Sequence, residues 1–278
     1  MTSLDAAVGL RASVGRPFQG RRGDPKRVAL LLLILLAASP SAQRGQPPRA
    51  AAAVDLTGYW VAVVTEDWRY RMVTPARGDH PSVPLNAAGN ALANAWDPAK
   101  DEAAGEQCRA YGAAGIMRAP GRLHITWQDD TTLKVDTEAG TQTRLLRFPS
   151  TSSGQATSAG PDGAPGWQGQ SAAAWEFAGP ARGGRGAAPA GPRSGNLKVV
   201  TTRMRTGYLQ KNGVPYSANA VLTEFFNRTI EPNGDSWLIL TSIVDDPQYL
   251  TGPFIRSTHY KRLADSNTAW EPEPCSSR

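Results

Sequence analysis

The residues best suited to acid–base chemistry in this chain are carboxylates and histidines. Adjacent carboxylates with a possible acid–base role occur at Glu66-Asp67, Asp129-Asp130 and Asp245-Asp246. A pair of acids is what many hydrolases need. Adjacent residues on a strand point to opposite faces, however, so the two members of a pair cannot act on the same substrate atom. Turn formation is the better explanation for these pairs.

A hydrolase-like site therefore requires residues that are distant in sequence to meet in one cleft. The candidates for such a carboxylate/histidine site inside the fold are Glu224, Asp67, His124 and Arg69. His259, near the end of the last expected strand, is a further histidine with a possible catalytic role. The sequence contains no nucleophile elbow, phosphate-binding glycine loop or His-Glu-x-x-His helix. Enzymatic activity stays undecided at this point, and the balance is against it.

The two cysteines, Cys108 and Cys275, are expected to form a disulfide, because an even pair in an exported chain usually does. Two separate buried thiols are the alternative. Neither the cysteines nor the three histidines have the spacing of metal ligands, so no metal and no cofactor is expected.

Aromatic side chains suggest a binding site of a different kind. Several of them recur on expected strands and, pointing into a barrel, would line an apolar pocket: Trp68, Tyr70, Trp127, Trp175, Phe225 and Trp237. The alternative is that the same rings fill a core.

These side chains have to be positioned mainly by strands. Alternating apolar and polar residues mark half-buried strands at 122–127, 133–136 and 144–148, and β-branched or aromatic runs add strands at 59–64, 68–72, 175–177, 197–202, 221–226, 237–241 and 254–260. Residues 85–96 are the one good helix candidate. This pattern predicts a mainly β fold: a single antiparallel barrel, or a barrel-like sandwich, with one short helix and low-complexity loops.

Three regions follow one another along the chain. Residues 1–42 are interpreted as a signal peptide, with a basic stretch ending at Lys26-Arg27, an apolar run at Val28–Ala38 and small residues after it. Residues 43–54 are expected to be a disordered tether. Residues 55–278 form one β-rich domain with flexible insertions near 149–166 and 179–195. No stable membrane anchor is expected after cleavage, and an uncleaved anchor is the alternative.

The net charge argues against a nucleic-acid partner. Residues 1–42 contain six basic and two acidic residues, a net charge of +4, so the rest of the chain carries only +2 of the total of +6. A nearly neutral domain lacks the electrostatic footprint that nucleic acid requires.

The segment Thr57-Gly58-Tyr59-Trp60 resembles the G-x-W opening of lipocalin-type barrels. The resemblance implies that Gly58 relieves crowding where the first strand enters, and that Trp60 plugs the closed end of the barrel beneath an arginine, Arg256 or Arg262. A disulfide that ties the C-terminal segment to the body is also common in that family. Phrases at 55–72, 96–108, 121–127, 140–144 and 223–250 are similar to a group of uncharacterised exported bacterial proteins, which implies export and a single fold.

The leading functional hypothesis is a periplasmic or secreted β-barrel protein that binds a small apolar or amphipathic ligand. One alternative is an envelope enzyme with a carboxylate/histidine site in the barrel. The other is an envelope interaction module without a small ligand, which would offer a partner protein an aromatic patch or sheet edge.

Overall fold

The computed structural model describes residues 46–149, 164–177, 194–263 and 269–278. The expected signal peptide and most of the two expected insertions lie outside the described residues.

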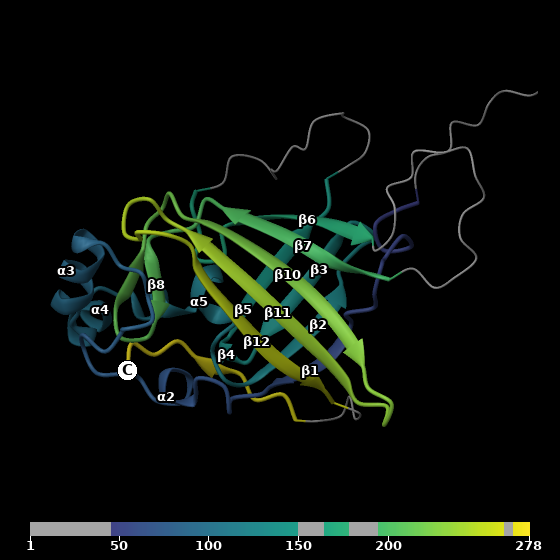
Figure 1. Ribbon diagram of the computed structural model, residues 1–278, viewed down its shortest axis with the longest axis horizontal. Coiled ribbons are helices and arrows are strands. Elements are labelled where there is room, and N and C mark those ends of the chain that lie inside the picture. The colour runs from purple at the N-terminus through teal and green to yellow at the C-terminus, as the bar shows by residue number, and fades with distance from the viewer. Residues whose placement is uncertain (1–45, 150–163, 178–193, 264–268) are drawn as a thin grey trace, which may run out of the picture. The chain divides into compact units, whose positions relative to one another are not determined.

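Nine strands form a closed barrel, which confirms the expected mainly β fold (Figure 1). Around the barrel the strands are β1 (Gly58–Ala62), β12 (Phe254–Arg262), β11 (Ser236–Asp245), β10 (Val221–Ile230), β7 (Gly195–Thr202), β6 (Gln170–Phe177), β5 (Gln142–Arg147), β3 (Thr132–Thr137) and β2 (Arg122–Trp127), which pairs with β1.

One pairing in the barrel departs from the expected antiparallel pattern. Strands β5 and β6 run parallel, with Leu146 opposite Ser171 and Arg147 opposite Ala172. A parallel pair needs a long crossover connection. Residues 148–169 supply that length, and the barrel is therefore mixed.

The remaining described elements are short. They are α2 (Trp68–Arg71), α3 (Ala87–Ala95), α4 (Pro98–Ala103), η1 (Gln107–Tyr111), α5 (Ala113–Ile116), β4 (Ala139–Gly140), β8 (Gly207–Gln210), β9 (Val214–Tyr216) and β13 (Glu273–Pro274). The expected helix at 85–96 is confirmed as α3, whose N-terminus is capped by the Asn86 side chain accepting from the Gly89 N–H. Figure 1 shows α3, α4 and α5 gathered with β8 at one end of the barrel.

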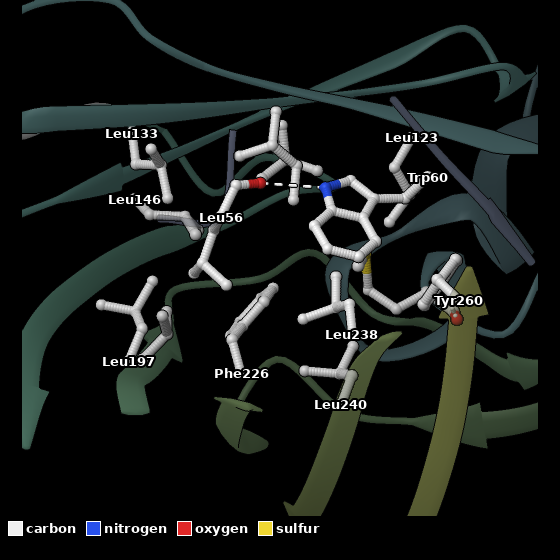
Figure 2. Packing of buried hydrophobic residues seen from close by; sticks show 14 of the residues in the cluster. Leu56, Trp60, Leu123, Leu133, Leu146, Leu197, Phe226, Leu238, Leu240 and Tyr260 are labelled. Atoms are coloured by element: carbon white, nitrogen blue, oxygen red, sulfur yellow. Dashed lines mark hydrogen bonds between the residues drawn. The ribbon is translucent and has the colours of Figure 1, made fainter. Parts of the chain in front are cut away.

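Alternation along the strands decides which side chains face the interior. In β10, for example, Leu222, Glu224 and Phe226 are buried, whereas Phe225 between them is only half-buried. Inward-facing apolar side chains from several strands pack into one cluster (Figure 2). This cluster fills the part of the barrel around Trp60.

Trp60 lies in this cluster with no exposed surface, and its indole N–H donates to the Leu56 carbonyl at 2.9 Å (Figure 2). The guanidinium group of Arg262 lies 5.8 Å from the Trp60 ring centre. Gly58 has a φ of +118°, and a Cβ there would lie 3.1 Å from Arg262. Arg262 is thus the expected arginine that lies beside Trp60, and Arg228, at 5.9 Å from the ring centre, is a second one. Placing Arg256 there is wrong, because its guanidinium lies over Phe254, at the other end of β12.

Residues 46–54 lie against the barrel, although their composition predicts a disordered tether. The Trp175 indole N–H donates to the Pro48 carbonyl at 2.9 Å, and the Arg49 N–H donates to the Asp130 carbonyl at 3.1 Å. Ala53 is buried. Contacts with the barrel order this segment, which its own sequence could not do alone.

The expected disulfide between Cys108 and Cys275 is present, with 5.1 Å between the two Cα atoms. It joins η1 to the segment that follows β13. Strand β13 also pairs in parallel with β4, which further holds the C-terminal segment on the body.

Residues 68–72 do not form the expected strand. They form α2, preceded by Asp67 in the left-handed backbone region (φ 54°). The expectation failed because aromatic and basic residues alternate here, whereas Arg71 is the only buried residue of α2. The position of α2 is determined by the burial of Arg71, whereas its aromatic side chains are not buried.

Helix α2 follows the point where β1 stops pairing with β12. Strand β1 pairs with β12 only from Trp60–Arg262 to Ala62–Tyr260, and one further hydrogen bond runs from the Val63 N–H to the His259 carbonyl. Residues 63–71 then leave the sheet. On the side that β1 does not cover, the first part of β12 therefore contacts side chains of residues 63–71.

Candidate functional site

Four of the six expected pocket aromatics do not face the barrel interior: Trp68, Tyr70, Phe225 and Trp237. Trp68 is on α2 and 60% exposed. Phe225 and Trp237 lie on the outward phase of their strands, where Lys198 and Lys261 place their ammonium groups 5.6 and 5.7 Å from the respective ring centres. The expectation that these rings line a lumen is wrong, because each lies one residue out of phase or outside the sheet.

Trp127 and Trp175 do belong to an inward phase, near one end of the barrel. Their rings pack with Phe148, at centre distances of 5.7 Å for Trp127 and 5.4 Å for Trp175. Both tryptophans border the main core cluster, and Trp175 binds the 46–54 segment through Pro48. Both tryptophans therefore extend the hydrophobic core, and Trp175 also holds the 46–54 segment against the barrel. Tyr70, the sixth aromatic, is on α2, with its hydroxyl 3.4 Å from Asp79.

The middle of the barrel is occupied by side chains. Trp60, Phe226, Leu238 and Glu224 have no accessible surface, and Arg144 has 1%. A cavity that admitted water would leave accessible surface on the side chains lining it. No water-sized space therefore adjoins the four side chains that have no accessible surface.

The four expected catalytic residues do not converge. Glu224 lies inside the barrel and is bound by Arg144, with N–O distances of 2.9 and 2.5 Å. His124 is on the other side of the wall, on the outward phase of β2, stacked on a tyrosine ring at 4.0 Å. Asp67 and Arg69 belong to the α2 region, and the exposed Arg69 is paired with the partly buried Asp79. A catalytic site made of these four residues is ruled out by this arrangement.

A different set of charged side chains gathers around α2 and the start of β12. We call it the α2 cluster, and it consists of Glu66, Asp67, Arg71, Arg118, Arg256 and His259. Its members come from the loop after β1, from α2, from the loop before β2 and from β12.

Arg71 is the buried centre of the α2 cluster. Its Nε donates to the Arg118 carbonyl at 2.9 Å and its Nη1 to the Val63 carbonyl at 2.6 Å. Its Nη2 has no hydrogen-bond partner among the described residues. Burial lowers the pKa of Arg71, and the neighbouring Arg118 charge lowers it as well. An arginine in such a place remains charged, so Arg71 contributes a buried positive charge to the cluster.

Arg118 and Arg256 share one carboxylate. Asp67 Oδ2 lies 3.1 Å from Arg118 Nη2 and 3.9 Å from Arg256 Nε. The same Arg256 Nε is buried and has no hydrogen-bond partner within the described part of the chain. Burial and the charge of Arg118 both lower the pKa of Arg256. Three guanidinium groups thus face two carboxylates, and the cluster carries one excess positive charge when His259 is neutral.

Apolar side chains lie beside this charge. Trp68, Met72 and Val73, which flank Arg71 in sequence, are 60%, 53% and 58% exposed. Large apolar residues so exposed and so close together are typical of contact surfaces. An exposed apolar surface formed by Trp68, Met72 and Val73 therefore adjoins the charged α2 cluster.

His259 adds acid–base capacity to the cluster. Its Nδ1 is in hydrogen-bond contact with Glu66 Oε1, and its Nε2 lies 3.5 Å from Ser257 Oγ. Glu66 is also 3.7 Å from Arg71. A histidine held by a carboxylate at one nitrogen and open at the other can accept a proton from a neighbouring hydroxyl.

Sequence reasoning named Glu66, Asp67, Arg256 and His259 in separate roles, and it missed Arg71 and Arg118. Glu66-Asp67 was expected to be a turn, and its two side chains indeed take different partners, His259 and Arg118. The signal available was the dense run of charged and aromatic residues at 66–71. The role of this run depends on its contacts with Arg118 in the loop before β2, and no local sequence pattern predicts those contacts.

Two global observations complete the description of the site. In the described residues, no group of three or more His, Cys, Asp or Glu side chains is placed to hold a metal ion. The helices in these ranges are all too short or too polar to cross a membrane. Comparisons with known proteins found no matching family model, no matching curated protein and no matching solved structure.

Proposed function

We propose that this protein is an exported binding protein for a small amphipathic anion, and that the α2 cluster is its binding site. The observation that carries the proposal is the group of three arginines around two carboxylates, which leaves one excess positive charge. Export is supported by the apolar run at Val28–Ala38 and by the disulfide.

An anionic headgroup would neutralise the excess positive charge of the α2 cluster. A carboxylate, sulfate or phosphate offers several acceptor oxygens, and guanidinium groups bind such oxygens with strong, charge-assisted hydrogen bonds. Because burial already costs the arginines part of their hydration, an anion that replaces the lost water is bound more tightly than at a fully exposed site.

The apolar part of the ligand is assigned to the surface of Trp68, Met72 and Val73. Contact with these side chains removes apolar area from water at a gain of about 25 cal/mol per Å². The barrel then serves as a rigid scaffold, and the ligand lies at its wall, since the barrel middle is occupied.

Isothermal titration calorimetry with sodium decanoate tests this proposal, with decan-1-ol as the uncharged counterpart. We expect decanoate to bind and decanol to bind much more weakly. Binding should weaken between 50 and 500 mM NaCl, since salt screens the attraction of accessible charges. Arg256→Gln should weaken decanoate binding by roughly tenfold or more, the value of a hydrogen bond to a charged group.

Arg69→Gln is the matched control, because Arg69 is on the same helix but pairs with Asp79 outside the cluster. It should leave the affinity unchanged. Trp68→Ala, which removes a side chain that is 60% exposed, should weaken decanoate more than acetate. Equal affinities of decanoate and decanol, or an equal effect of the two arginine variants, would refute an anion site at α2.

A further inference from the structure

The outer face of β12 presents a serine and a histidine side by side. Ile255, Ser257 and His259 alternate with inward residues, so they share the outward face. Ser257 is exposed and His259 is about one-third exposed. Neither is needed to fill the core.

The two ring nitrogens of His259 have different neighbours. Glu66 Oε1 contacts Nδ1, and a carboxylate can only accept, so Nδ1 carries the hydrogen. In the neutral imidazole this leaves a lone pair on Nε2, which faces Ser257 Oγ at 3.5 Å. The Ser257 hydroxyl is then the donor. A distance of this length is common between nucleophile and base before a substrate is bound.

We propose that Ser257, His259 and Glu66 form an esterase site, with Ser257 as nucleophile, His259 as general base and Glu66 as the positioning residue. A nucleophile, a base within reach of it and a third group that orients the base are the parts that serine hydrolases require, and they recur on unrelated folds. This activity goes beyond anion binding: it shares Glu66 and His259 with the α2 cluster, but it does not require that a free anion bind there.

The surroundings define the substrate class. On the neighbouring β11, Ile243, Thr241 and Ile239 lie opposite Ile255, Ser257 and His259 in the register. Outward residues directly opposite each other have Cβ atoms about 5 Å apart. The serine is thus bordered by isoleucines, which suit the acyl chain of an ester, and by the Thr241 hydroxyl, a donor for the oxyanion.

The reaction balances with water as the only co-reactant. Ser257 Oγ forms a bond to the acyl carbon while its proton moves to His259 Nε2. The ester C–O bond then breaks, and the leaving alcohol takes that proton. Water next attacks the acyl carbon and gives a proton to Nε2, which returns it to Ser257 Oγ as the carboxylic acid leaves. Glu66 holds the imidazolium formed in each half-reaction.

The test uses the disulfide-bonded protein with p-nitrophenyl butyrate and octanoate, and a fluorophosphonate probe that labels activated serines. We expect hydrolysis above the buffer rate and labelling at Ser257, located by peptide mass analysis. Ser257→Ala should abolish both. His259→Gln should reduce kcat by about 10² or more. Glu66→Gln should reduce kcat with KM unchanged, and Glu66→Asp should recover part of the loss.

His124→Gln is the matched control, because His124 is also an outward-facing histidine on a strand but stacks on Tyr59, away from any serine contact. It should leave the rate unchanged. Labelling at another residue, an undiminished rate in Ser257→Ala, or no labelling and no hydrolysis by the folded protein would each overturn the esterase proposal. Decanoate binding is measured separately, so either proposal can fail alone.

Discussion

Arg144 and Glu224 bring two opposite charges into the dry middle of the barrel. Their carboxylate and guanidinium groups meet at two points, and Thr201 lies 3.5 Å from Arg144 Nη2 while sharing a hydrogen bond with Ser171. Removing both charges from water costs several kcal/mol per ion, and their mutual attraction offsets this only while both are present. Each charge therefore depends on its partner.

Glu224→Gln should lower the free energy of unfolding by about 3–5 kcal/mol, because it leaves the Arg144 charge buried without compensation. The double variant Arg144→Met/Glu224→Leu, which removes both charges, should regain most of that loss. Urea denaturation measures both changes. A double variant as unstable as Glu224→Gln would show that the pair stabilises the barrel through more than mutual neutralisation.

At the scale of elements, the alternating strands were predictable and α2 was not. The strands at 122–127, 133–136 and 144–148 follow a period of two, which burial of one face imposes, and the structure confirms them as β2, β3 and β5. Helix α2 is placed by Arg71 reaching the carbonyls of Val63 and Arg118. Contacts with a loop 47 residues away leave no local pattern.

The candidate site shows the same division. Ser257 and His259 share a face because of strand alternation, so their proximity follows from the sequence once β12 is assigned. Glu66 reaches His259 only because β1 ends early and the chain turns at Asp67. Strand alternation predicts that Ser257 and His259 share one face of β12, but no sequence pattern predicts that Glu66 contacts His259.

Three short elements meet at Tyr208 and give a pH-dependent contact. The Tyr208 hydroxyl on β8 donates to Asp101 on α4 at 2.9 Å and lies 3.0 Å from Arg109 on η1. Burial, with the hydrogen bond to Asp101 as second cause, raises the pKa of Tyr208 from 10 to about 12. The protonated phenol is therefore favoured in the folded state.

A raised pKa gives a stability contribution that is complete below pH 10 and is lost as the pH rises through about 12. Between pH 8 and pH 11 the wild type should lose more stability than Tyr208→Phe, which has no proton to release at this position. Urea denaturation at both pH values gives the comparison. Equal losses in the two proteins would contradict the assigned role of Tyr208.

At the scale of the whole molecule, the Cys108–Cys275 disulfide links positions 167 residues apart and encloses most of the barrel. In the chain-entropy model such a loop stabilises the folded state by up to about 5 kcal/mol, because it restricts the unfolded chain. The pairing of β13 with β4 and the hydrogen bond from the Thr141 hydroxyl to the Glu273 carbonyl hold the same segment without the disulfide. Loss of the disulfide should therefore weaken the global fold more than it alters the folded structure.

The variant Cys108→Ala/Cys275→Ala should have a lower free energy of unfolding, by at most about 5 kcal/mol. Its m-value should remain proportional to the surface exposed on unfolding. Hydrogen exchange at the Glu273 amide, which donates to the Glu138 carbonyl, should become faster, while exchange in β10 and β11 follows only the global change. Unchanged stability would contradict the entropic role of the disulfide. Complete loss of barrel protection would instead show that β13 and β4 cannot hold the C-terminal segment alone, and that the barrel depends on this covalent link to stay closed.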